Sequence, residues 1–382
     1  MSNFAASIEI IIVMNEYTIK LLIPFAGIIS FFMVFFSIPS ILRVAHQKNF
    51  FDEAGHRSVH KGKIPTLGGL AIFLGFLFTY SLFVDWFEFT KIPFLIPAII
   101  IIFGIGIKDD ILVTAPIVKL LGQIIAAFII VGMGDLRITD LHGFFGIELN
   151  YLASISISIF LMVFIINGFN LIDGIDGLAA ITGIITIISF GVWFYLNGNY
   201  HIPIMSSALV GGLIAFAYYN VFSKHQKIFM GDTGSLMLGF LLSVVAISFS
   251  EFTIPEKYPN HPFTMNSGPA VALAILIVPV IDTIRVFFLR VSQGKSPFTA
   301  DKNHIHHRML ALGFNHLQTS LILGGINIGF VILGYYFRNL GMLKLTLLVF
   351  CLGIMVAYIP SVFLYIKRKD AMKRLNSMKR YN

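Results

Sequence analysis

The chain has 382 residues, of which 57% are hydrophobic and only 12% are charged, and its mean hydropathy is +0.86. A water-soluble domain of this length cannot bury so much apolar surface, so the composition excludes an ordinary soluble protein and predicts an integral membrane protein. The net charge of +8 is then a matter of membrane topology, and we expect no nucleic-acid partner.

Apolar segments follow one another along nearly the whole chain, and each approaches the roughly 20 residues that a helix needs to cross the hydrocarbon layer. We therefore expect an all-α polytopic protein with about eleven transmembrane helices, forming one membrane domain over residues 1–382. The spans are predicted at 18–41, 64–84, 91–107, 115–132, 151–166, 176–196, 202–222, 233–250, 269–289, 318–337 and 343–366.

Three features outside this pattern are interpreted as structural. Residues 135–150 alternate partially around His142 and Gly143, which predicts a short extracytoplasmic β-hairpin. The first residues lack the basic start and cleavage site of a signal peptide, so we expect the first span to remain as a signal anchor. The single cysteine, Cys351, lies in an apolar run and offers neither a disulfide nor a cysteine metal site.

The placement of the basic residues predicts the orientation. If the basic tail at 367–382 is cytoplasmic, an odd number of spans puts the amino terminus outside. The loops at 42–63, 108–119, 167–178, 220–235 and 285–317 then form the inner face. All but six of the 27 Lys and Arg residues fall on that side, as the positive-inside rule expects; the six are Lys20, Lys91, Arg137, Lys257, Arg338 and Lys344.

Acidic residues gather at the same predicted face. A charge near the bilayer centre costs roughly 2.5 to 3.5 kcal/mol on insertion scales, so such groups are kept at membrane ends, in cavities or for function. Four distant segments contribute to this face: Asp109 and Asp110 after the third span, Asp173 and Asp176 after the fifth, Asp232 at the start of the eighth, and His304, His306, His307 and Arg308 after the ninth.

The residue types at this face suit the handling of a phosphate. Carboxylates and amides from different helices are hard oxygen ligands of the kind that bind Mg²⁺ or Mn²⁺. Imidazoles and an arginine neutralise phosphate oxygens through charge-assisted hydrogen bonds. The glycines of DGIDG (173–177) and GDTGS (231–235) let the backbone approach a polyanion closely. Together they predict a diphosphate-bearing substrate at the inner membrane face.

Each of these polar groups also has a simpler, structural interpretation. Asp232 precedes a run of small residues and could only cap a helix, while Asp109 and Asp110 could form a solvated helix end. The histidines could be an interfacial cluster, but they lack the usual zinc spacing. An ion-coupled transporter would keep its ionisable residues near the bilayer midplane, and a non-catalytic scaffold would not explain four converging polar motifs.

Five motifs, in one order, resemble those of the polyprenyl-phosphate N-acetylhexosamine-1-phosphate transferases. They are DEAGHRSVHKGKIPTLGG (52–69), KDD (108–110), NGFNLIDGIDGLA (167–179), FMGDTGS (229–235) and DKNHIHHR (301–308). The resemblance implies transfer of a sugar-1-phosphate from a UDP-sugar to undecaprenyl phosphate at the cytoplasmic leaflet, with release of UMP. It also implies a requirement for Mg²⁺, or Mn²⁺, and a location in the bacterial plasma membrane. A homodimer is left open.

The resemblance further implies residue roles. Asp232 is expected to be the main metal ligand, with Asn170 nearby. Asp109 and Asp110 are expected to position the lipid phosphate and, in one interpretation, to deprotonate it. Asp109, Asp110, Asp232 and His307 are therefore the expected catalytic residues. Uridine is expected at Asp173, Asp176, Asn220 and Phe229, the diphosphate and sugar at His304, His306, His307 and Arg308, and the lipid phosphate at Lys61, Thr66 and Lys119.

The pattern HIHHR (304–308) resembles the branch of this family that starts O-antigen, enterobacterial common antigen and teichoic acid synthesis. The branch that makes the first lipid intermediate of peptidoglycan carries three consecutive histidines and a lysine where this chain has Val113. UDP-N-acetylglucosamine is therefore the expected donor, with another UDP-N-acetylhexosamine or UDP-MurNAc-pentapeptide as alternatives. Direct attack by the lipid phosphate is favoured over a two-step route through a phosphorylated aspartate, because a carboxylate that holds a metal is a poor nucleophile.

Overall fold

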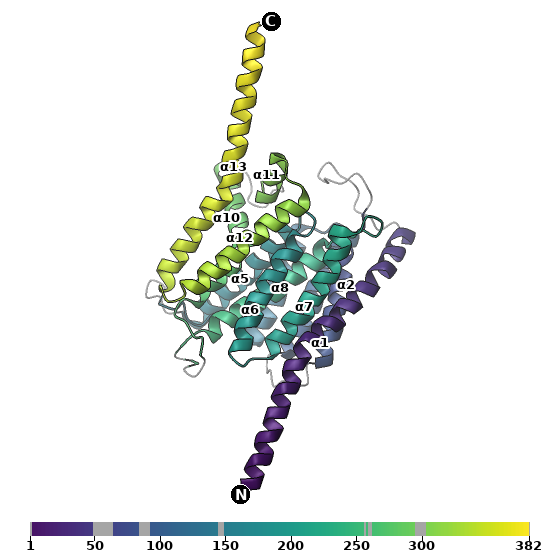
Figure 1. Ribbon diagram of the computed structural model, residues 1–382, viewed down its shortest axis with the longest axis vertical. Coiled ribbons are helices and arrows are strands. Elements are labelled where there is room, and N and C mark those ends of the chain that lie inside the picture. Colours follow the sequence, from purple (N-terminus) through teal and green to yellow (C-terminus); the bar gives the residue numbers. More distant parts are fainter. Residues whose placement is uncertain are drawn as a thin grey trace.

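The protein is a bundle of helices in the computed structural model, which describes residues 2–48, 64–83, 92–143, 149–255, 257–258, 262–294 and 303–381 (Figure 1). The elements are α1 (Ser2–Lys48), α2 (Gly68–Phe83), α3 (Ile92–Ile111), α4 (Pro116–Phe128) with a π-helical turn η2 (Ile129–Met133), α5 (Tyr151–Ile172), α6 (Leu178–Leu196), α7 (His201–Ala217) with a second π-helical turn η4 (Tyr218–Phe222), α8 (Gly231–Phe252), α9 (Gly268–Ile275), α10 (Ile277–Ser292), α11 (Ile305–Leu312), α12 (His316–Tyr336) and α13 (Met342–Tyr381).

The all-α prediction is confirmed, and a helix overlaps each expected span. The number eleven is not confirmed. Among the described residues, eight helices are long and apolar enough to cross a membrane, and a ninth candidate is the bent pair α9 and α10. Helix α2 is apolar but has only 16 residues, and α3 ends in the charged sequence Lys108-Asp109-Asp110.

Helix α8 lies at the centre of the bundle and is almost entirely buried. Helices α2, α3, α5, α6 and α9 pack around it, and glycines allow the closest approaches. A Cβ atom on Gly239 of α8 would lie 2.7 Å from the Cα of Ile166 in α5, and one on Gly106 of α3 would lie 2.5 Å from the Cα of Thr233. In a membrane no hydrophobic effect drives helices together, so small residues at the crossings, which let the backbones approach closely, provide the packing contacts.

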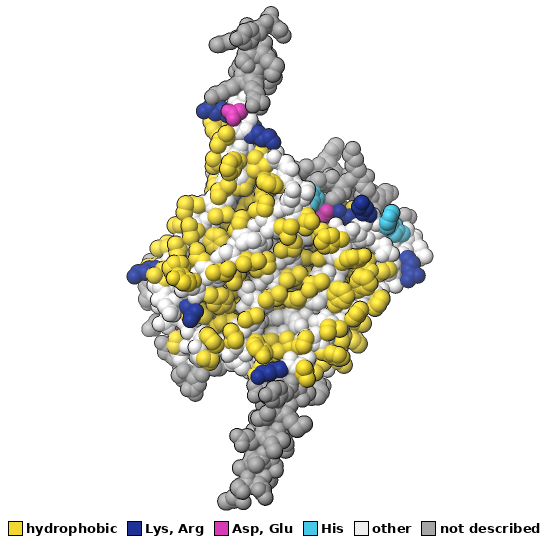
Figure 2. Space-filling model, in the orientation of Figure 1, with side chains coloured by type: hydrophobic (Ala, Val, Ile, Leu, Met, Phe, Trp, Pro, Cys, Tyr) yellow, Lys and Arg dark blue, Asp and Glu magenta, His cyan; other side chains and the backbone are white. Residues whose placement is uncertain are grey.

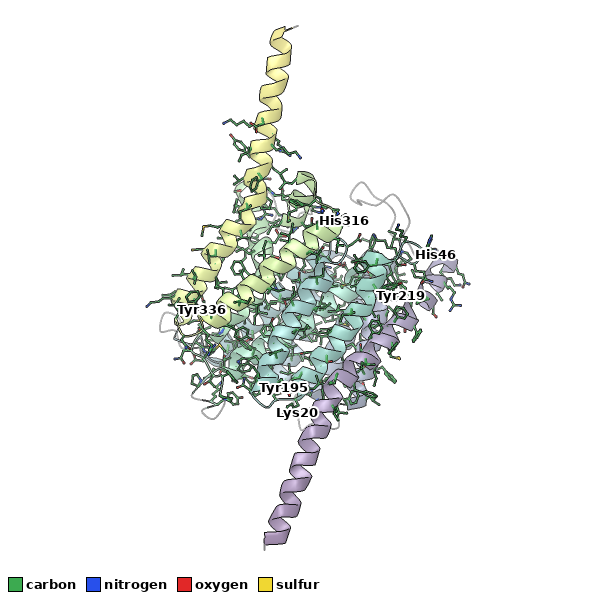
Figure 3. All side chains as sticks on the ribbon, viewed as in Figure 1. Lys20, His46, Tyr195, Tyr219, His316 and Tyr336 are labelled. Atoms are coloured by element: carbon green, nitrogen blue, oxygen red, sulfur yellow. The ribbon has the colours of Figure 1, made fainter. Side chains whose placement is uncertain are left out.

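The two ends of the bundle differ from its sides. Figure 2 shows apolar side chains across the middle of one face, with Lys and Arg side chains at its margins. In the apolar windows of α1 and α13 only 22% of the residues are buried, and both helices carry many exposed apolar side chains. Figure 3 places Tyr219 and His316 near one end, and Lys20, Tyr195 and Tyr336 near the other. The segment 367–381, predicted as a basic tail, continues α13 as a helix.

The predicted ninth span is broken rather than straight. Helices α9 and α10 meet at Leu276 with a bend of 81°. Pro279 lacks the N–H group that would otherwise bond to the carbonyl oxygen of Ile275, which explains a break one turn before it. That carbonyl oxygen instead receives the hydroxyl of Thr186 at 3.4 Å. The bend directs α10 toward the end of the bundle that carries α11.

The predicted β-hairpin is not confirmed. Residues 135–141 carry no strand, and none occurs elsewhere in the described ranges, while residues 144–148 lie outside them. Asp135 and His142 both adopt positive φ values, 48° and 53°. The segment is tied to α8 by Glu251, whose carboxylate accepts hydrogen bonds from the backbone N–H and the hydroxyl of Thr139 at 2.6 and 2.8 Å.

Candidate active site

The start of α8 is shaped by a glycine and capped by another helix. Gly231 has a φ of +73°, and a Cβ atom there would lie 2.1 Å from the carbonyl oxygen of Thr66. Asp110 of α3 accepts the backbone N–H of Asp232 at 2.7 Å on one oxygen. Its other oxygen accepts the backbone N–H and the hydroxyl of Thr233 at 2.9 and 2.5 Å. Asp110 therefore caps α8 from outside and fixes the position of Asp232.

Lys119 of α4 lies between two carboxylates. Its ammonium forms ion pairs with Asp109 of α3, at 2.5 Å, and with Asp232 of α8. Asp109 is held in place by Thr114, whose backbone N–H and hydroxyl donate to it at 2.8 and 2.5 Å. The Asp109, Lys119 and Asp232 side chains are 14%, 25% and 24% exposed, so a ligand can reach all three.

Asn170 of α5 completes this group. Its side-chain amide nitrogen donates to Asp232 at 3.0 Å and to the hydroxyl of Ser235 at 2.9 Å. The Asp232 carboxylate thus contacts Lys119 and Asn170. The sequence allowed Asp232 to be the cap of α8, but Asp110 caps this helix instead.

These side chains can accommodate a divalent cation. Within the described residues, no three acidic, histidine or cysteine side chains form a complete metal cage. Mg²⁺ does not need one, because it is commonly bound by one or two carboxylates together with substrate phosphates. Asp109 and Asp232 face a common cation, the Lys119 ammonium, and so fit that donor set. Asn170 presents its nitrogen, so its amide would have to rotate to become a ligand.

A second polar cluster lies at the loop that joins α5 to α6. Asp176 is 9% exposed, and one of its oxygens lies 2.7 Å from the ammonium of Lys227 and 3.0 Å from Nδ1 of His316 in α12. Burial opposes the negative charge, but the hydrogen bonds from His316 and Lys227 outweigh it and hold the pKa of Asp176 below its ordinary value.

Asn220 and Phe229 border the same loop. The Asn220 side chain accepts the backbone N–H of Gly177 at 2.7 Å and donates to the carbonyl oxygen of Ile228 at 2.9 Å, so it joins the two backbone segments. Phe229 is half-buried, and the Lys227 ammonium lies 5.9 Å from the centre of its ring. An aromatic face beside a carboxylate can receive a nucleobase.

Asp173 connects the two clusters electrostatically. It follows the last residue of α5 and is the first residue of the DGIDG turn. Burial raises the pKa of Asp173 well above its ordinary value, and the negative charges of Asp232, Asp110 and Asp176 raise it further. A cation or a hydrogen-bond donor from a substrate would be favoured at this position.

The histidine helix α11 closes the other side of this loop. His306 is 1% exposed, and a Cβ atom on Gly174 would lie 2.5 Å from its Nε2 atom. The imidazole rings of His306 and His307 lie 4.3 Å apart, centre to centre. Burial lowers the pKa of His306 to about 3, so the ring is neutral at physiological pH. Glycine at 174 is therefore required for α11 to approach the loop.

Arg308 points toward the last helix. Its guanidinium donates to the hydroxyl of Ser361 in α13 at 2.6 Å and to the backbone carbonyl of Asn303 at 3.3 Å. Burial lowers the pKa of Arg308, and the neighbouring charge of Arg285 lowers it further. Contact with a diphosphate would require the side chain to leave Ser361.

The structure brings most of the predicted residues into one region. Contacts link the carboxylate group of Asp109, Asp110 and Asp232 with Asn170 and Lys119, and link the α5–α6 loop with α11. Thr66 joins the first group through its backbone, and Lys61 lies outside the described residues. The catalytic and binding roles themselves stay predictions.

Three residues of this region were missed by sequence reasoning. Lys227 and His316 hold Asp176, and nothing in their local sequence marks them. Asp282 of α10 binds His304, and here a signal existed. An acidic residue inside the apolar segment 269–289, one helical turn before Arg285, is costly enough in a membrane to mark a functional position.

Comparison with known proteins agrees with this geometry. Residues 92–250 match the model of glycosyl transferase family 4. The decaprenyl-phosphate N-acetylglucosaminephosphotransferase of Mycobacterium leprae is 32% identical over 70% of this chain and 71% of its own length. The protein of that name from Mycobacterium tuberculosis H37Rv is 30% identical over 78% of both chains. The undecaprenyl-phosphate alpha-N-acetylglucosaminyl 1-phosphate transferase of Escherichia coli K12 is 27% identical over 74% of both. The resemblance found in the motifs is thereby confirmed, and the chain belongs to glycosyl transferase family 4.

Proposed function

We propose that this enzyme transfers N-acetylglucosamine-1-phosphate from UDP-N-acetylglucosamine to undecaprenyl phosphate and releases UMP. One observation carries the proposal: the Lys119 ammonium lies between the carboxylates of Asp109 and Asp232, which come from separate helices and remain partly exposed. A cation beside two carboxylates can hold a phosphate and a divalent ion together. The activities named for the relatives in Mycobacterium and Escherichia coli support the same reaction.

The proposed setting is the plasma membrane of a bacterium, with eleven spans, an outer amino terminus and a cytoplasmic active site. The distribution of Lys and Arg supports this orientation. The gathering of the site at the inner ends of α3, α5 and α10 and at the starts of α4, α8 and α12 supports it as well. A lipid phosphate and a water-soluble nucleotide can meet only at such an interface.

The proposed chemistry is direct phosphoryl transfer. An oxygen of the lipid phosphate attacks the sugar-bearing phosphorus of the donor, and the bond from that phosphorus to the bridging oxygen breaks. UMP leaves with the bridging oxygen, and the product is a lipid-linked diphosphate sugar. A phosphate is already a competent nucleophile near neutral pH, so the protein mainly positions the reactants and neutralises charge.

Mg²⁺, or Mn²⁺, is proposed at Asp109 and Asp232, where it would act as a Lewis acid on phosphate oxygens. Lys119 is the residue best placed to hold the lipid phosphate. Asp110 is disfavoured as a base or a nucleophile, because its two oxygens already accept three hydrogen bonds from the start of α8. The two-step alternative therefore rests on Asp109 or Asp232.

The donor is proposed to lie along the α5–α6 loop and α11. Phe229 offers an aromatic face for uracil near Lys227, which pairs with Asp176, and Asp173 lies in the same α5–α6 loop. The histidines of α11 lie beyond Gly174 and can receive the diphosphate. On the HIHHR pattern, the reaction is assigned to the start of a cell-surface polysaccharide such as O-antigen, common antigen or teichoic acid.

The experiment is release of UMP by purified protein with undecaprenyl phosphate and Mg²⁺. UDP-N-acetylglucosamine, UDP-N-acetylgalactosamine and UDP-MurNAc-pentapeptide are compared as donors, each with and without a chelator. We expect turnover with the first donor and loss of turnover with the chelator. Turnover with the pentapeptide donor alone would overturn the assignment of the donor, and a folded sample that is silent with all three would contradict the proposed reaction.

A further inference from the structure

A buried ion pair lies next to the histidine helix, in the part of α10 that follows the bend. Asp282 and Arg285 are 2% and 4% exposed, and Arg285 donates to one oxygen of Asp282 at 3.0 Å. Charged groups inside an apolar span are costly and are kept mainly where they serve a function. Neither residue contacts the carboxylate group of Asp109 and Asp232, so the pair needs an explanation of its own.

The Asp282 carboxylate holds the start of α11. One oxygen lies 2.9 Å from Nδ1 of His304, and the other accepts the backbone N–H of Ile305 at 3.0 Å. Arg285 reinforces the contact by donating to the carbonyl oxygen of Asn303. Asp282 is thus to α11 what Asp110 is to α8, a carboxylate from a neighbouring helix that caps its first turn.

The contact also defines the state of the imidazole. A carboxylate accepts hydrogen bonds and does not donate them, so Nδ1 of His304 carries the proton. Nε2 then lies on the opposite side of the ring, away from Asp282, and only the imidazolium form of the ring, with protons on both nitrogens, can donate from Nε2 to a phosphate oxygen. A second-sphere carboxylate that fixes a histidine in this way sets both its tautomer and its orientation.

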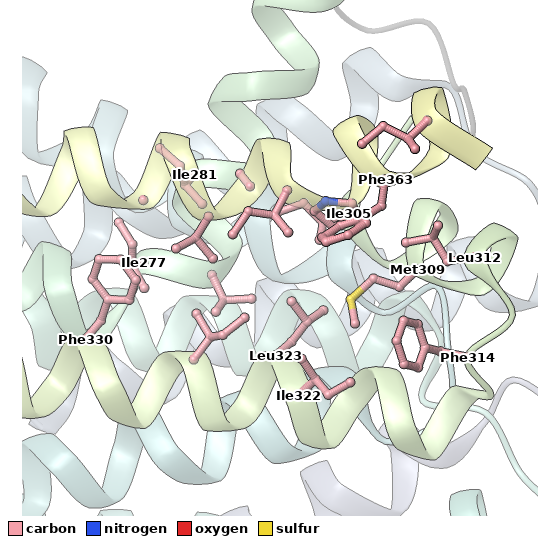
Figure 4. A pocket seen from close by; sticks show the side chains of 18 of the residues that line it. Ile277, Ile281, Ile305, Met309, Leu312, Phe314, Ile322, Leu323, Phe330 and Phe363 are labelled. Atoms are coloured by element: carbon pink, nitrogen blue, oxygen red, sulfur yellow. The ribbon is translucent and has the colours of Figure 1, made fainter. Parts of the chain in front are cut away.

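Apolar packing contributes to the position of α11 beside these polar contacts. Ile305 and Met309, on its apolar side, line a cavity of about 660 Å³ that α10, α12 and α13 enclose (Figure 4). Both side chains are nevertheless only 6% and 5% exposed and belong to the hydrophobic core, so they contribute to holding the helix. Because apolar contacts are non-directional, the polar contacts of Asp282 at the first turn are what fix the orientation of His304.

Resting on the proposed function, we propose that Asp282 is a positioning residue for donor binding: it orients His304 so that the Nε2–H group of its imidazolium form donates to the diphosphate of the nucleotide sugar. Arg285 is part of the same support. The donor then contacts a histidine whose geometry is set by α10, and the bend between α9 and α10 brings that carboxylate to the site.

The first test separates the anchor from the ligand contact in the full-length protein, with UDP and UMP as probes. His304→Asn keeps an N–H donor at the position of Nδ1 and has nothing at the position of Nε2. We expect its melting temperature to stay near that of the wild type. Its Kd for UDP should rise about tenfold or more, as for a lost hydrogen bond to a charged group, with a smaller change for UMP. A His304→Asn variant that binds UDP like the wild type would overturn the proposal.

The second test asks whether Asp282 acts through His304. Asp282→Asn should raise the Kd for UDP about tenfold, and the same change in a His304→Ala background should add less than about threefold, because coupled residues are non-additive. Equal effects in both backgrounds would mean a merely structural role. If Asp282→Asn does not fold, the Kd of His304→Asn for UDP alone decides whether the proposal holds.

Glu251→Gln is the matched control. Glu251 also holds a backbone N–H, that of Thr139, but far from α11, so we expect lower stability with unchanged UDP binding. Wild-type protein that binds UDP no more tightly than UMP would overturn the inference. Failure of the proposed function would look different: no release of UMP from UDP-N-acetylglucosamine, with the pattern of UDP binding intact.

Discussion

The carboxylate of Asp110 accepts the backbone N–H of Asp232 at 2.7 Å, so one member of the adjacent aspartate pair on α3 supports the helix that carries the third carboxylate. Its neighbour Asp109 instead shares the Lys119 ammonium with Asp232. Two consecutive aspartates thus face different partners, because successive residues of a helix point in directions about 100° apart. Their variants should behave differently.

Asp109→Asn and Asp232→Asn should each reduce turnover by about 100-fold or more, because each removes a charge that the reaction needs in a preorganised site. Both variants should fold, since an asparagine oxygen can still accept hydrogen bonds. The measurement is UMP release, with the melting temperature recorded alongside. Asp135→Asn, whose exposed carboxylate pairs with Arg137 beyond the far end of α4, is the matched control and should stay within about twofold, as expected for a surface pair. Full activity of folded Asp232→Asn would contradict the metal assignment.

Asp110→Asn should lose stability and turnover together. An asparagine presents an N–H group to one of the backbone N–H groups of α8, which leaves a buried donor unpaired at a cost of about 1 to 3 kcal/mol. Thermal unfolding in detergent and UMP release would be followed in parallel. A variant with wild-type stability and strongly reduced turnover would instead show that Asp110 acts directly on a substrate.

Gly174→Ala should weaken donor binding. The new Cβ atom would lie 2.5 Å from Nε2 of His306, so the α5–α6 loop or α11 must shift. We expect the KM for the UDP-sugar to rise about tenfold or more, on the scale of a lost contact to a charged ligand, with little change in the KM for the lipid. Gly325→Ala is the control, because a Cβ atom on this α12 residue meets nothing within 4 Å. Equal donor constants in the two variants would remove Gly174 from the donor site.

His306 should make stability depend on pH. Burial lowers its pKa from 6.5 to about 3, so below pH 6.5 the unfolded chain binds a proton that the folded protein does not. Stability should therefore fall as pH drops from about 6.5, by about 1.4 kcal/mol per pH unit for this group. His306→Phe removes the effect. The difference in melting temperature between wild type and variant, measured from pH 7.5 to 5, should stay nearly constant down to about pH 6.5 and then change steadily, and parallel curves would show that His306 is not held neutral by burial.

Much of the protein follows from the sequence alone. Apolar length predicts the helices, because a backbone without water must satisfy its own hydrogen bonds, and the clustering of carboxylates, glycines and histidines predicts one polar face. The family was recognisable from short motifs such as NGFNLIDGIDGLA and HIHHR, which hold polar side chains at fixed local spacings.

Only the tertiary structure decided which of those groups contact one another. That Asp110 caps α8 while Asp109 shares Lys119 with Asp232 depends on how α3, α4 and α8 cross. That Asp282 holds His304 depends on a bend of 81° between α9 and α10. These contacts join residues 10 to 123 positions apart along the chain, and local sequence contains no information on helix crossings. Periodicity and composition determine which segments are helices, whereas packing determines which side chains meet.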